Sequence, residues 1–391
     1  MKKKTLYLLI LIIICYTVCN IYWVKKENIR YVFQGLYSHH FFISLNTYNL
    51  ITRLDWTNLL IFIKQGPYPP LFQLLTSLAI FLFGKSYTGI VVLPNILLFS
   101  ITIFFIYKIG TLIEDSATGL IAAFFFSSYP MVYGLSRLYC FNFALMTVTV
   151  FSIYCLLRTD NFLDVKWSVL FGLSLGAGMM TKYPFAAFLA GPVIYSYIKA
   201  VRTDNFKIKR IINVTTATLI GILLSLPRYN HKGMLIKIMT DPFNESIGPW
   251  YAYNNLRKYT LGIIEEQLSP VFFIILVLGL YYFIKKYRNR SVKIIFILWI
   301  ILPWLILIFM PHRKSTDYVL PYIPAFALIS SIGFIKSNIK IKFKKITLAV
   351  LIMISTIQYL DLSYGIGIGL FNLRINIGHQ KTLHYFLPDI H

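Results

Sequence analysis

Three titratable side chains in one long polar segment are the first candidates for chemistry. His39, His40 and Asp55 lie in residues 25–67, directly after the first apolar stretch. A neutral imidazole can accept a proton at working pH, and the carboxylate of Asp55, which stands beside Trp56, is another candidate base. The structural alternatives are interfacial packing for the histidines and a surface acid at a helix start for Asp55. A loop of this length favours an enzyme over a plain channel or carrier.

The elements that must position these residues are membrane helices. Hydrophobic residues make up 57% of the chain and charged residues 13%, and the mean hydropathy is +0.67. Apolar runs long enough to cross about 30 Å of hydrocarbon recur along most of its length, which predicts an all-α polytopic membrane protein with about eleven spans. The expected spans are Thr5–Val24, Thr88–Tyr107, Ala117–Leu135, Phe141–Leu157, Trp167–Met180, Pro184–Ile198, Ile211–Leu226, Ser269–Ile284, Ile294–Met310, Tyr318–Ile335 and Ile346–Tyr364. The first is expected to stay uncleaved, because no small-x-small signal-peptidase site follows it.

The net charge of +24 is explained by membrane orientation. With the N-terminus in the cytoplasm, more than half of the 38 Lys and Arg residues fall in short inner segments, as the positive-inside rule requires. This distribution needs no nucleic-acid partner. It places the large loops and the C-terminus outside.

The predicted organisation is a transmembrane domain over residues 1–364, followed by a short outer tail, 365–391. A first outer loop, 25–87, contains surface helices, and a second outer loop covers 227–268. In the first loop, apolar side chains from Phe33 to Tyr48 recur at helical spacing, which predicts an amphipathic helix on the membrane surface. Leu71–Phe83 is predicted to be another surface helix, because it is too short for a comfortable span.

Four segments, taken in order, carry a family resemblance over roughly residues 5–335. They resemble the polyprenyl- or dolichyl-phosphate-sugar-dependent membrane glycosyltransferases of the GT-C fold, the group of glycosyltransferase family 39 and the lipid A aminoarabinose transferases. The segments are Pro69–Phe72 with Phe83-Gly84, Ser128–Pro130 with Ser136–Leu138, Gly172–Gly176 with Thr181–Pro184, and Tyr318–Ala325.

The resemblance implies a sugar donor linked through phosphate to a polyprenyl lipid, and an acceptor that is a protein, glycan or lipid. Such a site needs cations at the outer ends of helices to hold the phosphate. Arg137, Lys182, Arg313 and Lys314 are in that position, and Asn142 is suited to hydrogen-bond the sugar. The alternative for the cations is snorkelling to membrane lipid headgroups.

The catalytic base implied by the resemblance is a carboxylate in the first outer loop. Residues 35–40 have no acid there, and Asn142 stands where a second acid is expected. His39, His40 and Asp55 are the remaining candidates for the base. This departure leaves two alternatives to an active transferase: a degenerate homologue that binds lipid-linked sugar or a partner, and a lipid flippase or transporter. No acid falls in mid-span, which argues against ion coupling.

No metal or cofactor is expected. Adjacent histidines on a helix point to different faces, no second ligand cluster lies near them, and the resemblance does not imply a divalent ion. The four cysteines form no CxxC and are expected to be buried, unpaired side chains. Richness in Ile, Lys, Asn, Tyr and Phe is typical of an AT-rich bacterial genome and indicates a bacterial plasma membrane.

Overall fold

The computed structural model describes residues 3–26, 36–84, 87–230, 253–309 and 316–364, and all regular elements in these ranges are helices. They are α1 (Lys3–Lys26), α2 (Leu36–Thr52), α3 (Trp56–Gln65), α4 (Leu71–Phe83), α5 (Tyr87–Ile113), α6 (Ser116–Ser128), α7 (Pro130–Ser136), α8 (Phe141–Arg158), α9 (Val165–Thr181), α10 (Phe185–Arg202), α11 (Lys207–Tyr229), α13 (Tyr253–Thr260), the π-helix η2 (Ile263–Leu268), α14 (Pro270–Lys286), α15 (Arg290–Phe309), the 3-10 helix η3 (Thr316–Tyr322), α16 (Ile323–Lys336) and α17 (Ile341–Tyr364).

The expected membrane character is confirmed, but the count of eleven spans is not. Seven described helices are long and apolar enough to cross a membrane, or eight if a bent pair counts as one span. That pair is α6 and α7, which the sequence predicted as the single span Ala117–Leu135. It bends by 69° because Pro130 begins α7 and the residue before it, Tyr129, is extended, as the residue before a proline usually is.

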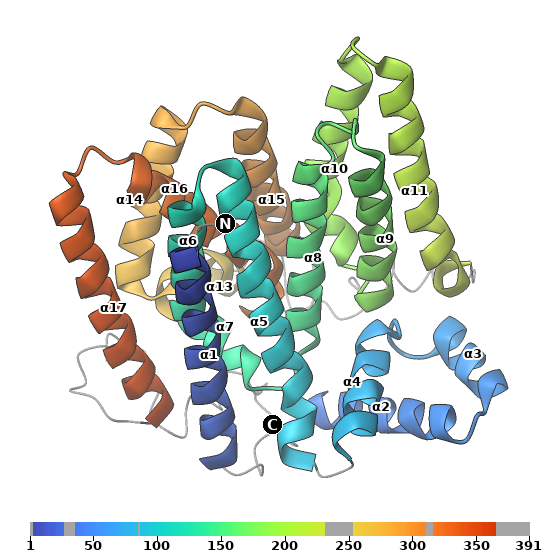
Figure 1. Ribbon diagram of the computed structural model, residues 1–391. Coiled ribbons are helices and arrows are strands. Elements are labelled where there is room, and N and C mark those ends of the chain that lie inside the picture. The colour runs from blue at the N-terminus through green and yellow to red at the C-terminus, as the bar shows by residue number, and fades with distance from the viewer. Residues whose placement is uncertain (1–2, 27–35, 85–86, 231–252, 310–315, 365–391) are drawn as a thin grey trace.

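The helices of the first loop form where the sequence placed them. Figure 1 shows α2, α3 and α4 together at the lower right, beside the lower ends of the long helices. We call this end of the bundle the site end, and the end where α5, α14 and α16 finish the opposite end. α4 follows Pro70 and stops at Gly84, whose φ of +85° favours a residue without a side chain.

A buried arginine fixes the turn between α3 and α4. Arg228, at the end of α11, is fully buried and its Nη2 donates to the carbonyl of Gly66 at 2.5 Å. A second contact, at 3.5 Å, reaches the carbonyl of Ile63. A buried guanidinium needs such acceptors, so the first-loop helices are anchored to the long helix α11.

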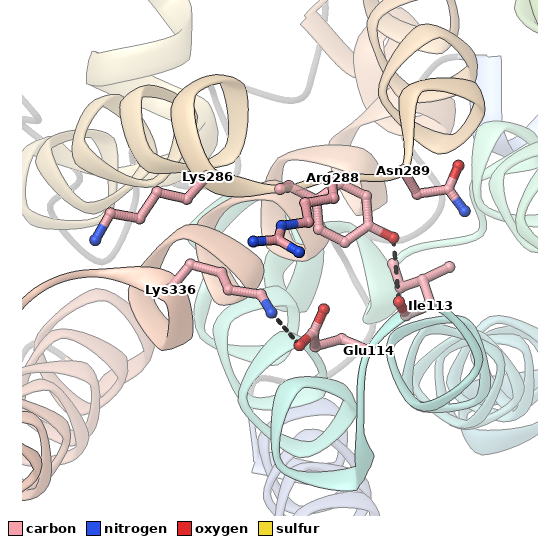
Figure 2. A pocket seen from close by; sticks show the side chains of 7 residues that line it. Ile113, Glu114, Lys286, Arg288, Asn289 and Lys336 are labelled. Atoms are coloured by element: carbon pink, nitrogen blue, oxygen red, sulfur yellow. Dashed lines mark hydrogen bonds and ion pairs between the residues drawn. The ribbon is translucent and has the colours of Figure 1, made fainter.

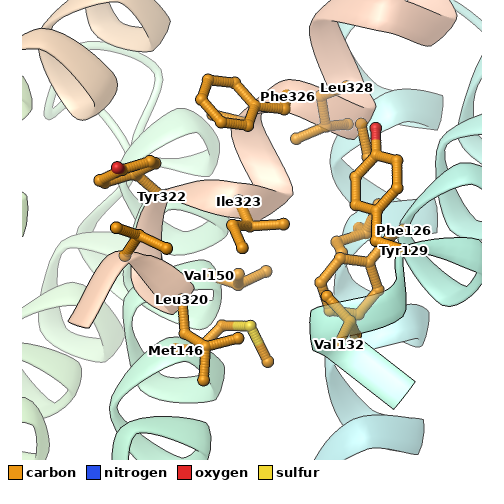
Figure 3. Packing of buried hydrophobic residues seen from close by; sticks show 14 of the residues in the cluster. Phe126, Tyr129, Val132, Met146, Val150, Leu320, Tyr322, Ile323, Phe326 and Leu328 are labelled. Atoms are coloured by element: carbon orange, nitrogen blue, oxygen red, sulfur yellow. The ribbon is translucent and has the colours of Figure 1, made fainter. Parts of the chain in front are cut away.

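The centre of the bundle is an apolar core between α6–α7, α8 and η3–α16. Figure 3 shows side chains from these three places converging, among them Tyr129, Met146, Val150, Leu320 and Ile323. All five are at most 1% exposed. The short helix η3 therefore packs against a close-packed core.

Two glycines bring α14 and α16 into backbone contact. A Cβ atom on Gly333 would lie 2.0 Å from the carbonyl oxygen of Gly279, and one on Gly279 would lie 2.6 Å from the Cα of Ser330. Small residues at such crossings are the usual means of close helix packing in membranes. This pair holds α16 directly against α14.

Candidate functional site

The start of α8 is held in place by an asparagine from α5. The fully buried Asn95 donates its side-chain N–H groups to the carbonyl of Leu138 and, at 3.2 Å, to the carbonyl of Cys140. Residues 137–140 connect α7 to α8, so these bonds tie the backbone of the connection to α5. The connection ends two residues before Asn142, which is 3% exposed.

Lys182 reaches the same place from the end of α9. It is the C-cap residue of that helix, with an extended backbone and its N–H donated to the carbonyl of Gly178. The Phe185 ring packs over Gly178, where an added Cβ would lie 2.2 Å from the ring. This compact turn directs Lys182 toward the start of α8, where its Nζ donates to Asn142 Oδ1 at 2.9 Å.

The third contribution comes from η3 and was missed by the sequence analysis. Asn142 Nδ2 donates to Asp317 Oδ2 at 2.5 Å, and Cys140 Sγ lies 3.9 Å from the same carboxylate oxygen. The Lys182 ammonium is 5.1 Å from the centre of the Tyr318 ring. A hydrogen bond from Trp299 Nε1 to the carbonyl of Pro321, at 3.0 Å, fixes η3 against α15.

We call Cys140, Asn142, Lys182, Asp317 and Tyr318 the Asn142 cluster. Its central amide accepts from a cation and donates to a carboxylate, so both polar ends of Asn142 are used. Burial lowers the pKa of Lys182, and the opposing effect of the Asp317 charge is smaller. Burial also raises the pKa of the Cys140 thiol to about 12, so this thiol stays protonated and is a hydrogen-bond donor rather than a nucleophile.

An aromatic cluster joins the first-loop helices to this site. The His40 ring lies 4.4 Å from Tyr68 and 4.4 Å from Phe141, measured between ring centres, and Phe141 directly precedes Asn142. The Phe72 ring is 4.6 Å from Phe141. The hydroxyl of Tyr139 is also hydrogen-bonded to α2 and α4, through Ser44 and Thr76. Of the proposed bases, His40 is thus brought next to the Asn142 cluster through one aromatic side chain.

Asp55 has a different environment. It is the N-cap residue of α3, and its carboxylate accepts from the backbone N–H of Asn58 at 3.1 Å and from the Asn58 amide at 2.7 Å. These hydrogen bonds lower the pKa of Asp55, because they stabilise the charged form. A lowered pKa makes a carboxylate a weaker base. Its catalytic role, proposed from the sequence, stays a prediction.

Three further predicted residues cannot be placed in the site. Arg313 and Lys314 lie outside the described residues, and so does the side chain of His39, although its backbone belongs to α2. Their roles stay predictions. Within the described residues, no group of three or more His, Cys, Asp or Glu side chains could hold a metal ion. The four cysteines are free thiols; Cys140 and Cys155 are buried as expected, whereas Cys15 is exposed and Cys19 is half-buried.

Arg137 belongs to a separate, neutral cluster between α1, α7 and α17. Its guanidinium, 2% exposed, donates to Asn20 Oδ1 at 2.9 Å and to Ser363 Oγ at 2.8 Å. The rings of Trp23, Tyr133 and Tyr359 surround it at 4.8 to 5.2 Å. Within the described part of the chain, therefore, its partners are neutral groups of three helices, and this arrangement suits a structural anchor.

Replacing Arg137 with methionine is expected to lower the free energy of unfolding by about 2–4 kcal/mol, because two hydrogen bonds and three ring contacts are lost. The measurement is the apparent unfolding temperature of purified protein in one detergent. Arg158→Met is the matched control, since Arg158 is exposed and lies over a single ring, Trp167, at 4.8 Å. Equal shifts in the two variants would contradict the anchoring role.

Comparison with known proteins bears on the same region. Residues 67–229 match the family described as dolichyl-phosphate-mannose-protein mannosyltransferase. This range contains Arg137, Asn142 and Lys182 and ends before Asp317. No curated protein matches the chain at a significant level.

Two solved structures are similar to the chain in fold. One is ArnT from Cupriavidus metallidurans bound to undecaprenyl phosphate, with a TM-score of 0.54 and 12% identity, covering 75% of this chain and 55% of that one. The other is the oligosaccharyltransferase of Archaeoglobus fulgidus tethered to an acceptor peptide with the NVT sequon, with a TM-score of 0.53 and 12% identity, covering 88% and 54%. The chain thus spans about half the length of these proteins.

Proposed function

Starting from the GT-C fold, which the chain shares with these two membrane proteins, we propose that it is a membrane glycosyltransferase with a polyprenyl-phosphate sugar as donor. The observation that carries the proposal is the Asn142 cluster. It places a cation, an amide and a carboxylate together at the ends of three helices, beside the first-loop helices. ArnT, one of the two similar structures, binds undecaprenyl phosphate, and this supports the lipid-phosphate donor.

The proposed roles follow from charge. When the glycosidic bond to the donor breaks, polyprenyl phosphate leaves with added negative charge, which a nearby cation stabilises. Lys182 is assigned this role, because its ammonium is already held in place by Asn142. Asn142 also remains the candidate to hydrogen-bond the sugar.

Asp317 is proposed as the general base, in the place that the sequence left to His39, His40 or Asp55. The acceptor hydroxyl or amine attacks the anomeric carbon, the bond to the phosphate oxygen breaks, and the acceptor proton passes to the carboxylate. Asp317 is a partly exposed residue at the start of η3. The hydrogen bond from Asn142 orients it.

The proposed orientation puts the site end on the outer face of a bacterial plasma membrane. The opposite end carries the basic residues of the α14–α15 and α16–α17 connections, such as Lys285, Arg288 and Lys340. Basic segments stay on the cytoplasmic side, and this rule supports an N-terminus inside. The acceptor is a protein, glycan or lipid on the outer side.

The test is turnover by the purified full chain. Given a polyprenyl-phosphate sugar, it is expected to release polyprenyl phosphate only when an acceptor is present. The panel should vary the donor sugar and offer peptide, glycan and lipid acceptors. Release of polyprenyl phosphate at the same rate with and without an acceptor would contradict the proposal, and so would a complete absence of donor binding.

A second function is favoured by one observation, the asparagine at position 142 where the resemblance expects an acid. A homologue without catalysis would bind the lipid-linked sugar and hold it for a partner. Donor binding without turnover across the whole panel would support this alternative. The two functions therefore give different results in the same assay.

A further inference from the structure

A small basic pocket lies at the opposite end of the bundle from the Asn142 cluster. It has a volume of about 260 Å³ and is formed where α5 ends, where α14 turns into α15, and where α16 ends. Figure 2 shows Lys286, Arg288 and Lys336 around it, together with the single carboxylate Glu114. The helices that supply these residues run away from the site end, so the two sites are separated by the length of the bundle.

The walls of the pocket are fixed by the protein itself. Tyr287, 4% exposed, donates its hydroxyl to the carbonyl of Ile113 at 3.1 Å, which joins the α14–α15 turn to the end of α5. Asn289 Oδ1 accepts from the backbone N–H of Val292 at 3.1 Å and so caps the start of α15. The turn between Lys286 and Arg290 is therefore held in one shape without a ligand.

The charges in the pocket do not balance. Lys336 forms an ion pair with Glu114, and Lys286 donates to the Asn338 side chain. Arg288 forms no hydrogen bond or ion pair within the described residues, and Figure 2 shows its guanidinium extending toward the Glu114–Lys336 pair. Glu114 thus balances Lys336, whereas Lys286 and Arg288 have no acidic partner among the described residues, which leaves an excess of positive charge in a concave site.

We propose that this pocket binds a phosphate-bearing anion, with Arg288 as its principal ligand. Arginine offers paired donors that match phosphate oxygens, and basic pockets between membrane helices on the cytoplasmic side bind phosphate headgroups. The volume is below the roughly 300 Å³ at which sites for larger organic ligands begin, so a headgroup or a small phosphate fits better. The anion is a phospholipid headgroup or a soluble phosphate. This proposal does not depend on glycosyl transfer.

The competing explanation is orientation alone, since basic residues on this side also determine topology. If the basic residues serve only to orient the protein in the membrane, neighbouring cations should contribute equally. If they form a binding site, the residues that line the pocket should contribute more than their neighbours. Arg290 begins α15 two residues after Arg288, is also exposed, and does not line the pocket. It provides the matched control.

The experiment compares three single variants with the unchanged full chain in detergent micelles. They are Arg288→Gln, Arg290→Gln and Glu114→Gln. Native mass spectrometry measures binding of phosphatidylglycerol and of phosphatidylcholine with the same acyl chains. A parallel titration with inorganic phosphate tests a soluble source. The unfolding temperature of each variant confirms that the fold is kept.

Phosphatidylglycerol binding is expected to change in opposite directions in Arg288→Gln and Glu114→Gln. Arg288→Gln should weaken phosphatidylglycerol binding roughly threefold to tenfold, less than for a buried contact because Arg288 is exposed. Glu114→Gln should strengthen it by about twofold to fivefold, because a competing carboxylate is removed and Lys336 is released. Arg290→Gln should stay close to the unchanged protein.

The two anion sources give separate results. If the headgroup is the ligand, phosphatidylglycerol is preferred over phosphatidylcholine and inorganic phosphate does not displace it. If a soluble phosphate is the ligand, inorganic phosphate binds with the same dependence on Arg288 and Glu114. The proposal would be overturned if Arg288→Gln and Arg290→Gln lost the same amount of binding affinity. It would also be overturned if the protein neither preferred phosphatidylglycerol over phosphatidylcholine nor bound inorganic phosphate.

Discussion

Asp317→Asn is expected to lower turnover by about 10²- to 10⁴-fold, the range over which general bases contribute. The substitution keeps the size of the side chain and removes both its negative charge and its capacity to accept the acceptor proton. Donor affinity should stay the same or rise, because the carboxylate charge repels the donor phosphate. A fall in turnover together with unchanged or tighter donor binding would identify Asp317 as the base, since a folding defect would weaken both.

Two carboxylates serve as controls for this prediction. Asp361 lies on α17 toward the site end, and Asp361→Asn should leave turnover unchanged. Asp55→Asn retains helix capping, because asparagine is as good an N-cap as aspartate, so any loss of turnover in it would be chemical. If Asp55→Asn loses turnover and Asp317→Asn does not, the base is Asp55, one of the three candidates that the sequence left.

Lys182→Met is expected to raise the donor KM by roughly 10- to 100-fold, because a hydrogen bond to a charged group contributes about 1.5–3 kcal/mol. Turnover at saturating donor should also fall, since the leaving phosphate loses its counter-charge. Lys166→Met is the matched control, because Lys166 lies on the same helix, α9, at its other end. Equal KM values in Lys182→Met and the unchanged protein would remove Lys182 from the donor site.

The pH dependence of donor binding provides a second test of Lys182. Burial lowers the pKa of this side chain, so its ammonium loses its proton at a lower pH than a solvated lysine would. Donor affinity should therefore be full at pH values below the lowered pKa and fall as the pH rises through it. In Lys182→Arg the guanidinium stays charged, and the alkaline loss should disappear. A loss of the same size in both proteins would show that another group titrates.

Local sequence signals predicted the helices well. Pro69 and Pro70 before an apolar run and Gly84 after it predicted α4 with its observed bounds. Each of the eleven expected spans overlaps a described helix, because long apolar runs have few alternatives to a helix in a membrane. The bend between α6 and α7 was not predicted. Pro130 was visible in the sequence, but whether a proline kinks or ends a helix depends on the surrounding packing.

The site was predicted in part, for a physical reason. Asn142 and Lys182 were identified from motifs, yet their contact joins residues 40 positions apart. Asp317 lies 175 positions from Asn142 and precedes the fourth motif directly. The only local signal for Asp317 was its position directly before the motif Tyr318–Ala325. That position does not reveal that Asp317 contacts Asn142. The neutral partners of Arg137 lie on α1 and α17, and tertiary packing alone brings them together.

The glycine contact between α14 and α16 fixes one point of α16, so a tilt of α16 would turn about that point. Gly333 is three residues from Lys336, in the basic pocket, and ten from Ile323, where α16 takes over from η3. At 1.5 Å per residue, the part of α16 from Gly333 to Ile323 is about three times as long as the part from Gly333 to Lys336. A tilt of α16 about this point would therefore move Ile323 about three times as far as Lys336, and in the opposite direction.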